Sequence, residues 1–80
     1  MRIDKFLKNS RLIKRRTVSK DACEKGFVFI NDKVAKPGSE VCVGDIIRIE
    51  FGNSSLKAKV LDITDSQKKE DALKMYEIIQ

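Results

Sequence analysis

Apolar positions at the start of the chain recur with the period of an α-helix. Ile3, Phe6 and Leu7 stand at positions i, i+3 and i+4, which share one face of a helix. This spacing predicts a short helix over residues 2–9. Asp4 falls in its first turn, where a carboxylate either complements the positive end of the helix dipole or orients a neighbouring arginine. The sequence leaves both interpretations of Asp4 open.

A second helix is predicted from about Arg16 to Lys25. Pairs of residues four positions apart mark its inner side, Val18 with Ala22 and Ser19 with Cys23. Gly26 follows, as expected of a glycine that ends a helix in the left-handed conformation. Between the two helices, Leu12 and Ile13 form an apolar pair that is expected to anchor a basic connection in the core.

The pattern changes to strands after the second helix. Strand-type residues occupy four segments, residues 27–30, 33–36, 46–51 and 56–63. Turn-forming residues separate these segments, namely Asn31-Asp32, Pro37-Gly38, Gly44-Asp45 and residues 52–55. In the third segment, Ile47, Ile49 and Phe51 face one way, while the residues between them face the other. We therefore expect a small, mostly antiparallel sheet.

A third helix is predicted from about Ser66 to the end of the chain. Four apolar positions recur there with helical spacing, Ala72, Met75, Tyr76 and Ile79. The predicted fold class is α+β, with two N-terminal helices packed on the sheet and a helix at the C-terminus. Because no repeat or linker interrupts the 80 residues, we expect one small domain.

Basic side chains are concentrated at the start of the chain. Eight of the 17 lysines and arginines lie within residues 1–20, against a single acid, so this segment carries +7. The other 60 residues hold nine bases and eleven acids. A solvated helical face is one explanation, but the shortage of acids favours a face that binds phosphates. The candidate RNA-binding residues are Arg2, Asp4, Lys5, Lys8, Arg11, Lys14, Arg15, Arg16 and Lys20.

Other functional classes find little support. The chain has no histidine, no glycine-rich phosphate loop and no nucleophile with an evident activator, so we expect neither an enzyme nor a metal or cofactor site. Cys23 and Cys42 are expected to be buried thiols that pack as small hydrophobic groups. No apolar run approaches the ~20 residues of a membrane span. No secretory signal is recognisable either, so we expect a cytoplasmic protein.

A set of motifs extends over about residues 1–51. They are Arg2-Ile3-Asp4-Lys5-Phe6-Leu7, Arg16, Gly26-x-Val28-x-Ile30-Asn31, Lys33, Lys36-Pro37 and Val41-x-x-Gly44-Asp45. Together they resemble the S4 RNA-binding domain family, with residues 56–80 as an added strand and helix. The resemblance implies that the two helices and the adjoining turn form a basic face for structured RNA. Arg15-Arg16 departs from the family's Ser-Arg, which removes a hydroxyl cap and leaves Thr17 as the nearest alternative. Asn31-Asp32 replaces the usual Asn-Gly turn.

A closer resemblance covers nearly the whole chain. The run from Ser10 to Thr17, the Lys68-Lys69-Glu70 segment and the Met75-Tyr76 ending are similar to the RqcP family of minimal bacterial S4 proteins, which is related to the small heat-shock S4 protein. This resemblance implies a factor of ribosome-associated quality control. Such a factor would bind obstructed large (50S) ribosomal subunits as a monomer, contact 23S rRNA and peptidyl-tRNA, and support RqcH in adding alanine tails to stalled chains.

Two other functions fit the same charge pattern. A ribosome-assembly or structural rRNA-binding protein would present a similar basic face, and so would an RNA-targeting module for a separate RNA-modifying enzyme. The chain has no tryptophan and few other aromatic residues, so we do not expect stacking on unpaired bases to dominate. The sequence alone does not separate these alternatives.

Overall fold

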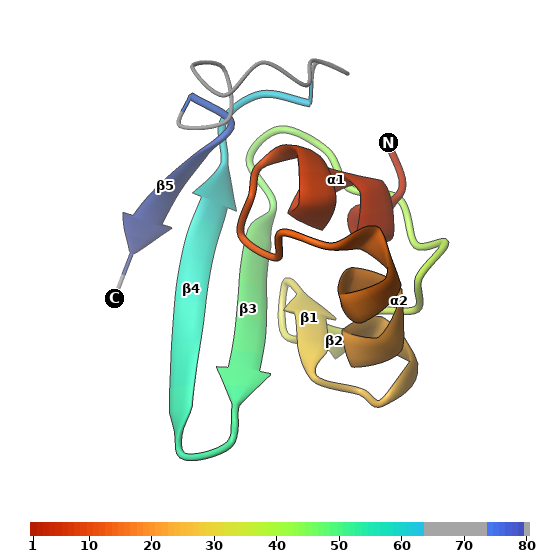
Figure 1. Cartoon of the computed structure of the whole chain (residues 1–80). Coiled ribbons are helices and arrows are strands. Elements are labelled where there is room, and N and C mark those ends of the chain that lie inside the picture. Colours follow the sequence, from red (N-terminus) through yellow and green to blue (C-terminus); the bar gives the residue numbers. More distant parts are fainter. Residues whose placement is uncertain (64–73, 80) are drawn as a thin grey trace.

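An antiparallel sheet with two helices on one side organises the chain (Figure 1). The computed structural model describes residues 1–63 and 74–79. The helices are α1 (Ile3–Asn9) and α2 (Arg16–Glu24), and the strands are β1 (Val28–Ile30), β2 (Lys33–Val34), β3 (Ile46–Phe51), β4 (Ser54–Val60) and β5 (Tyr76–Ile79). The sheet order is β2-β1-β3-β4-β5, and each neighbouring pair is antiparallel. The predicted α+β class is confirmed. No helix in the described ranges is long and apolar enough to cross a membrane.

The core lies between α1 and the central strands. Ile3, Phe6 and Leu7, the three residues with helical spacing, are fully buried. They belong to one cluster with Ile47 and Ile49 of β3, the residues that alternate toward the helices. The apolar stripe of α1 therefore covers the middle of the sheet, and the basic residues of α1 are left toward solvent.

The connection between the helices and the end of α2 follow the sequence prediction. Ile13 is buried, and Leu12 packs against the same core cluster. Gly26 has a φ of +79°. Its N–H donates to Cys23 O at 3.1 Å, and Phe27 N–H donates to Ala22 O at 2.9 Å. This pair of hydrogen bonds closes the last carbonyls of α2 in a Schellman motif, which needs a residue with positive φ at this position.

The β1–β2 turn is joined to the start of β3. Asn31 and Asp32 both have positive φ, 51° and 68°, as a two-residue type I′ turn requires. The Asn31 amide nitrogen donates to Asp45 Oδ1 at 3.1 Å, and Ile46 N–H donates to Asn31 Oδ1 at 3.0 Å. The predicted turn pair therefore also sets where β3 begins.

Four strands lie where the sequence predicts them; β3 has the predicted ends, and β1, β2 and β4 differ by a few residues. In the β3–β4 hairpin, Phe51 pairs with Ser54 and Glu50 with Ser55, so the turn is shorter than the predicted loop over residues 52–55. β4 ends at Val60 rather than at residue 63. Short turns of this kind are common in twisted hairpins, and the strand pattern alone does not locate their limits.

The predicted C-terminal helix is wrong for residues 76–79. These residues form β5, in which Tyr76 lies opposite Val60 and Ile79 opposite Lys57 of β4. Met75 is buried in the core. Aromatic and β-branched residues favour a strand, and β5 gives β4 a hydrogen-bonding partner on its outer edge. A short apolar segment fits both periodicities, so its spacing did not decide between them. Residues 66–73 of the predicted helix lie outside the described residues.

Two side chains predicted to face the interior, Val18 and Cys42, lie at the surface instead, and so does Phe51. Val18 and Phe51 are each 49% exposed, and Cys42 is exposed, whereas Cys23 is buried as predicted. On α2, Ser19 and Cys23 face the interior, and Val18 lies to one side of them. Phe51 keeps the alternation of β3 but stands at the last position of the strand, beyond the cover of the core.

Candidate nucleic-acid interface

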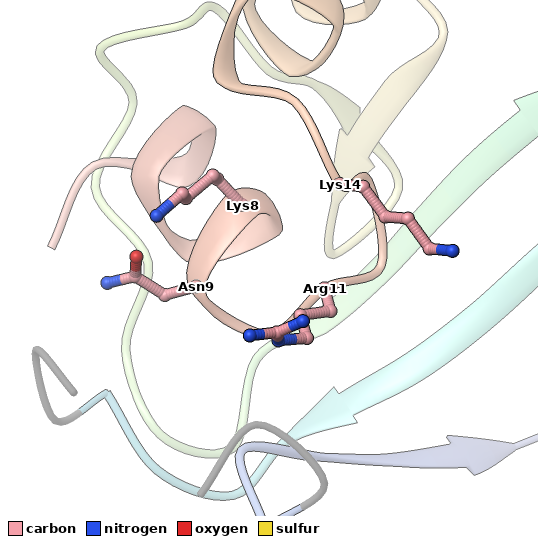
Figure 2. Close-up of a pocket in the computed structure, with 4 residues that line it drawn as sticks. All are labelled: Lys8, Asn9, Arg11 and Lys14. Carbon is pink, nitrogen blue, oxygen red and sulfur yellow. The ribbon is translucent and has the colours of Figure 1, made fainter. Parts of the chain in front are cut away.

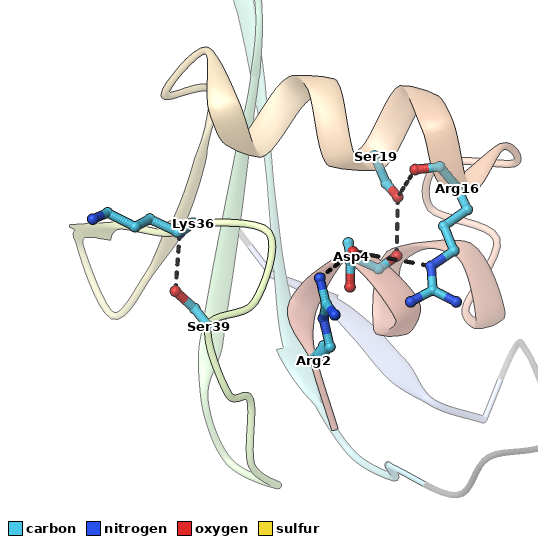
Figure 3. Close-up of polar contacts among 6 residues, drawn as sticks. All are labelled: Arg2, Asp4, Arg16, Ser19, Lys36 and Ser39. Carbon is cyan, nitrogen blue, oxygen red and sulfur yellow. Dashed lines mark hydrogen bonds and ion pairs between the residues drawn. The ribbon is translucent and has the colours of Figure 1, made fainter.

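A buried carboxylate holds two arginines at the N-terminal ends of α1 and α2. Arg2 Nη2 lies 3.2 Å from Asp4 Oδ2, and Arg16 Nε lies 3.9 Å from the same oxygen. The Asp4 side chain is 2% exposed, while the Arg2 and Arg16 side chains are 50% and 51% exposed. Figure 3 shows the two arginines reaching Asp4 from opposite sides. We refer to Arg2, Asp4 and Arg16 as the Asp4 cluster. An arginine has five N–H donors, so both side chains keep donors for a ligand.

The first turn of α1 is fixed by the loop that precedes residue 40. Ile3 N–H donates to Ser39 O at 2.8 Å, and Asp4 N–H donates to Pro37 O at 3.3 Å. These bonds satisfy N–H groups that a helix start leaves without intrahelical partners. Asp4 stands in the first turn of α1 and contacts two arginines, which is the geometry that both of its predicted roles require. The loop was not among the predicted site residues.

Ser19 joins the two helices directly beneath the Asp4 cluster. It is fully buried, and its hydroxyl oxygen lies 2.9 Å from Asp4 O and 2.8 Å from Arg16 O. Figure 3 shows this hydroxyl between the backbones of α1 and α2. From its place in the sequence, Ser19 is expected only to pack on the inner side of α2. The sequence signal for this contact is a hydroxyl on the inner side of a helix, because a buried hydroxyl needs a hydrogen-bond partner.

A second group of predicted residues surrounds a cavity at the C-terminal end of α1. The cavity has a volume of about 150 Å³ and is lined by Lys8, Asn9, Arg11 and Lys14. In Figure 2, the side chains of Lys8, Asn9 and Arg11 extend toward the same side, and Lys14 extends the opposite way. We call these four residues the basic cavity. Three cations and an amide around a small hollow can supply several hydrogen-bond donors to one anionic group.

Arg11 occupies a backbone conformation that favours glycine. Its φ is 62°, directly after the C-terminal residue of α1 and the C-cap Ser10. Its N–H donates to Lys8 O at 3.1 Å, and Ile13 N–H donates to Leu7 O at 3.1 Å, so the helix end is closed by the same turn that a glycine would make. A side chain at this position costs free energy. Strained residues of this kind cluster at functional sites, which agrees with a role for the guanidinium group.

The start of α2 carries positive charge and no acid of its own. Arg15 is the N-cap residue, with φ −114° and ψ 132°, and its side chain makes no capping hydrogen bond. The first turn of α2 contains no acidic residue. The positive end of the helix dipole and two arginines therefore lie together, which is unfavourable for an isolated helix and favourable for a bound anion.

The structure brings six of the nine predicted residues into two groups, and a seventh lies beside one of them. Arg2, Asp4 and Arg16 form the Asp4 cluster, Lys8, Arg11 and Lys14 belong to the basic cavity, and Arg15 lies next to Arg16. Lys20 is exposed one turn further along α2, and Lys5 is half-buried on α1. All nine residues belong to the two helices, the N-cap of α1 and the connection between the helices.

Arg48, on β3, lies in a different environment. Its Nη1 lies 3.2 Å from Asp32 Oδ1, its Nη2 lies 3.6 Å from Glu50 Oε1, and its guanidinium carbon lies 4.2 Å from the centre of the Phe29 ring. Two carboxylates and an aromatic face contact this cation within the protein, while its buried Nε has no hydrogen-bond partner among the described residues. Arg48 therefore belongs to the surface of the sheet rather than to the basic face.

Cys23 is an unreactive thiol below the site. Burial, together with the negative charges of Asp4 and Glu24, raises the pKa of the Cys23 thiol from 9.0 to about 11. The thiolate is the reactive form, so Cys23 stays protonated and inert at neutral pH. Because its folded pKa exceeds the unfolded value, its contribution to stability is complete below pH 9 and is lost as the pH rises toward 11. The described residues contain no group of ligands suited to a metal ion.

A family model named S4 domain matches residues 1–47, which is more than half of the chain. The chain belongs to the S4 domain family. The match contains all nine predicted site residues, and its limits are close to the predicted extent of the resemblance, residues 1–51. Both helices and the strands β1 and β2 are part of the matched S4 domain.

Proteins with a more specific name are similar over almost the whole length of this S4 chain. It is 53% identical over 79 residues to a Streptococcus pneumoniae protein named RQC P-site tRNA stabilizing factor, and the match covers 99% of this chain and 90% of that protein. It is 45% identical over 80 residues to a Bacillus subtilis protein of the same name, with 100% and 93% covered. These relatives confirm the resemblance to the RqcP family.

A solved structure confirms the fold. The trimeric structure of Vibrio cholerae heat shock protein 15 superimposes with a TM-score of 0.89 at 28% identity, over 99% of this chain and 81% of that chain. The sheet and helices described above are therefore arranged as in that protein, which supports the predicted S4-like fold.

Proposed function

We propose that this chain binds structured RNA through the Asp4 cluster and the basic cavity. The observation that carries the proposal is the pair of half-exposed arginines placed 3.2 Å and 3.9 Å from one buried carboxylate. Burying a carboxylate costs free energy, and an ion pair recovers that cost only with good geometry. Asp4 is therefore better explained by the orientation that it imposes on Arg2 and Arg16 than by stability.

The arrangement suits the backbone of double-stranded RNA. An A-form helix hides its base edges in a narrow major groove and presents phosphates and 2′-hydroxyls, so a rigid face that matches its shape can bind it without reading bases. Oriented guanidinium groups bind phosphate oxygens in pairs. The start of α2 adds further N–H donors and the positive end of its dipole.

The names of the relatives support a more specific function. We propose that the RNA ligands are 23S rRNA and the peptidyl-tRNA in the P site of obstructed large ribosomal subunits. In this proposal the chain acts without catalytic activity, in the cytoplasm, as a factor of ribosome-associated quality control. A single copy presents the complete basic face, so it would act as a monomer. By holding the tRNA, it would support the RqcH-dependent addition of alanine to the stalled chain.

The proposal is tested by replacing Arg16. Arg16→Ala should reduce co-sedimentation with purified large subunits about tenfold or more, since hydrogen bonds to charged groups contribute about 1.5–3 kcal/mol. Arg16→Lys should restore little of the binding, because an ammonium group lacks the planar fork. Arg2→Ala should behave like Arg16→Ala. The melting temperature of Arg16→Ala should change little, because Arg16 lies 3.9 Å from Asp4 and Arg2 still pairs with that carboxylate at 3.2 Å.

Lys59→Ala is the matched control for the loss of one positive charge. Lys59 is exposed on β4, outside the two helices that carry the basic face. Arg48 is unsuitable, because its replacement would also remove two ion pairs and the contact with Phe29. If Arg16→Ala co-sediments normally at physiological salt while Lys59→Ala does not, RNA binds another face of the molecule.

The distribution of the protein among ribosomal particles separates this function from its alternatives. A quality-control factor should be substoichiometric and enriched on large subunits that carry peptidyl-tRNA. An assembly protein should accompany immature particles, and a structural protein should be present on all of them. A targeting module should co-purify with a modifying enzyme. Sucrose-gradient fractionation of cells expressing the tagged protein distinguishes these outcomes.

A further inference from the structure

An apolar groove lies beside the basic connection, between α2 and the end of β3. Its volume is about 380 Å³, within the range of about 300–1,000 Å³ typical of ligand sites. Val18, Phe27 and Phe51 line it and are 49%, 47% and 49% exposed. Leu12 and Ile13 line it as well. Phe27 follows the end of α2, and Phe51 ends β3, so two aromatic side chains from different elements border one hollow.

The charged side chains that line the groove are both acidic. Asp21 Oδ2 lies 3.0 Å from Lys25 Nζ, and Glu50 Oε1 lies 3.6 Å from Arg48 Nη2. The side chains of Asp21 and Glu50 are 56% and 46% exposed, so these ion pairs leave both carboxylates open to solvent. The charged residues that line the groove are therefore opposite in sign to those of the basic cavity, although each has a cation beside it. A half-exposed carboxylate keeps lone pairs that can accept from a second cationic donor.

We propose that this groove docks a segment of a neighbouring protein in which an aliphatic or aromatic side chain is flanked by lysine or arginine. The apolar side chain fills the hollow between Val18, Phe27 and Phe51, and the flanking cations meet Asp21 and Glu50. Half-exposed aromatic residues around a pocket are the usual anchors of protein interfaces. The proposal rests on the proposed function, since proteins assembled on the same RNA carry the basic segments that neutralise it.

The connection between the helices would link the docked segment to the bound RNA. Leu12 and Ile13 line the groove, while Arg11 and Lys14 on either side of them line the basic cavity. Ligands of opposite charge can thus occupy adjoining faces at the same time. The protein partner and the RNA therefore do not compete for one surface.

Synthetic peptides test the chemistry of the occupant. The probe is an eight-residue peptide with a central Leu-Phe pair between two Lys-Lys-Lys segments, titrated into the ¹⁵N-labelled full-length protein. Amide shifts should change saturably at Val18, Ala22, Phe27 and Phe51. A peptide with Ser-Ser in place of Leu-Phe, and one with Glu in place of Lys, should each bind at least tenfold more weakly. Saturable changes confined to another surface, or equal binding of all three peptides, would overturn the proposal.

Two variants separate the groove from general charge effects. Glu50→Lys should weaken the lysine-flanked peptide at least threefold and strengthen the glutamate-flanked peptide. Glu77→Lys makes the same charge change on β5, outside the groove, and should alter neither affinity. Phe51→Ser should remove peptide binding and leave the binding of large subunits unchanged. If Glu77→Lys matches Glu50→Lys, the peptide senses only net charge and the groove is not its site.

If the groove binds a second copy of this chain or RNA instead, the measurements give distinct results. Sedimentation velocity would reveal self-association that Phe51→Ser abolishes, in which case the groove holds a second copy of this chain and the proposal fails. An rRNA hairpin that shifts the groove amides and displaces the peptide would make the groove part of the RNA face, which also overturns it. Arg16→Ala should lose the large subunit and keep the peptide, so a failure of the proposed function is recognised separately from a failure of the groove.

Discussion

At the scale of single residues, the site is built from side chains that act against local stability. Asp4 is a charged group placed in the interior, Arg11 has a backbone conformation that favours glycine, and Arg15 stands at an N-cap without making a cap. Each of these choices costs free energy in the isolated protein. Their common property is that each places or orients a cation on one face.

Replacing Asp4 separates orientation from net charge. Asp4→Asn removes a negative charge from a face proposed to bind a polyanion, so charge alone predicts tighter binding. We expect weaker binding instead, by roughly fivefold, which corresponds to about 1 kcal/mol, because Arg2 and Arg16 lose the carboxylate that orients them. The measurement is the affinity for a rRNA hairpin or for large subunits. Glu24→Gln, the same charge change on the exposed surface of α2, is the control and should bind as well as the wild type or better.

The positive φ of Arg11 allows its side chain and its backbone to be tested independently. Arg11→Gly and Arg11→Ala remove the same guanidinium group and should weaken RNA binding equally. Only glycine relieves the left-handed backbone, so the glycine variant should be more stable than the alanine variant by about 1 kcal/mol. Thermal denaturation measures this difference. Equal melting temperatures would show that Arg11 is not strained in solution.

At the scale of elements, the two helices act as one unit. The Ser19 hydroxyl contacts the backbones of both helices, the Asp4 carboxylate reaches one arginine at the start of each, and the loop before residue 40 fixes the first turn of α1. The position of the basic face therefore depends on the packing of α1 against α2. This packing requires α2 to end at the correct residue.

Gly26 is the residue that stops α2. Gly26→Val should lower the free energy of unfolding by about 1–2 kcal/mol, because its φ of +79° is strained for a β-branched residue. No atom lies within 4 Å of the added Cβ, so the cost comes from the backbone alone. Gly38→Ala is the control: its φ is not positive, and its Cβ would lie 4.0 Å from Arg2 Nε and Nη2, an ordinary contact. Denaturant titration should show a loss for Gly26→Val only.

The sequence was sufficient for elements whose signal is local. The spacing of Ile3, Phe6 and Leu7 placed α1, and Gly26 placed the end of α2, because both signals act within one or two turns. β5 was missed because its partner, β4, is distant along the chain. The hydrogen bonds that the Ser19 hydroxyl donates and that Ser39 O accepts were missed for the same reason, since the position of a neighbouring backbone is decided by tertiary packing. The concentration of lysines and arginines near the N-terminus indicated which cations belong to the site. Their arrangement around Asp4 depends on tertiary packing, so the sequence alone did not show it.

At the scale of the whole molecule, charge is divided between faces. The helices, the N-cap of α1 and the connection between them carry all nine predicted RNA-binding residues, whereas the groove between α2 and β3 is bordered by carboxylates. The overall charge of +5 is therefore a poor guide to the surface that an RNA would meet. The local concentration of cations, rather than the net charge, should determine how steeply RNA affinity falls with salt.

RNA affinity should fall steeply as salt is added. About five phosphate contacts give a slope between −3.5 and −4.5 in a plot of log affinity against log salt concentration, because each contact releases bound counterions. Arg16→Ala should make this slope shallower by about 0.7–0.9, and Lys59→Ala should leave it unchanged. Filter binding or fluorescence anisotropy with an rRNA hairpin provides the measurement. A slope near zero would contradict a binding mode driven by phosphates.

The concentration of cations in residues 1–20, against a small negative balance in the rest of the chain, gives the molecule a permanent electric dipole. In the field of a large polyanion, a torque acts on this dipole before any contact is made, and it turns the ends of the helices toward the particle. Productive encounters then make up a larger share of all collisions, so association is accelerated without any change in the bonds of the final complex. For a protein proposed to find a rare particle among many, this asymmetry would increase the speed of the search.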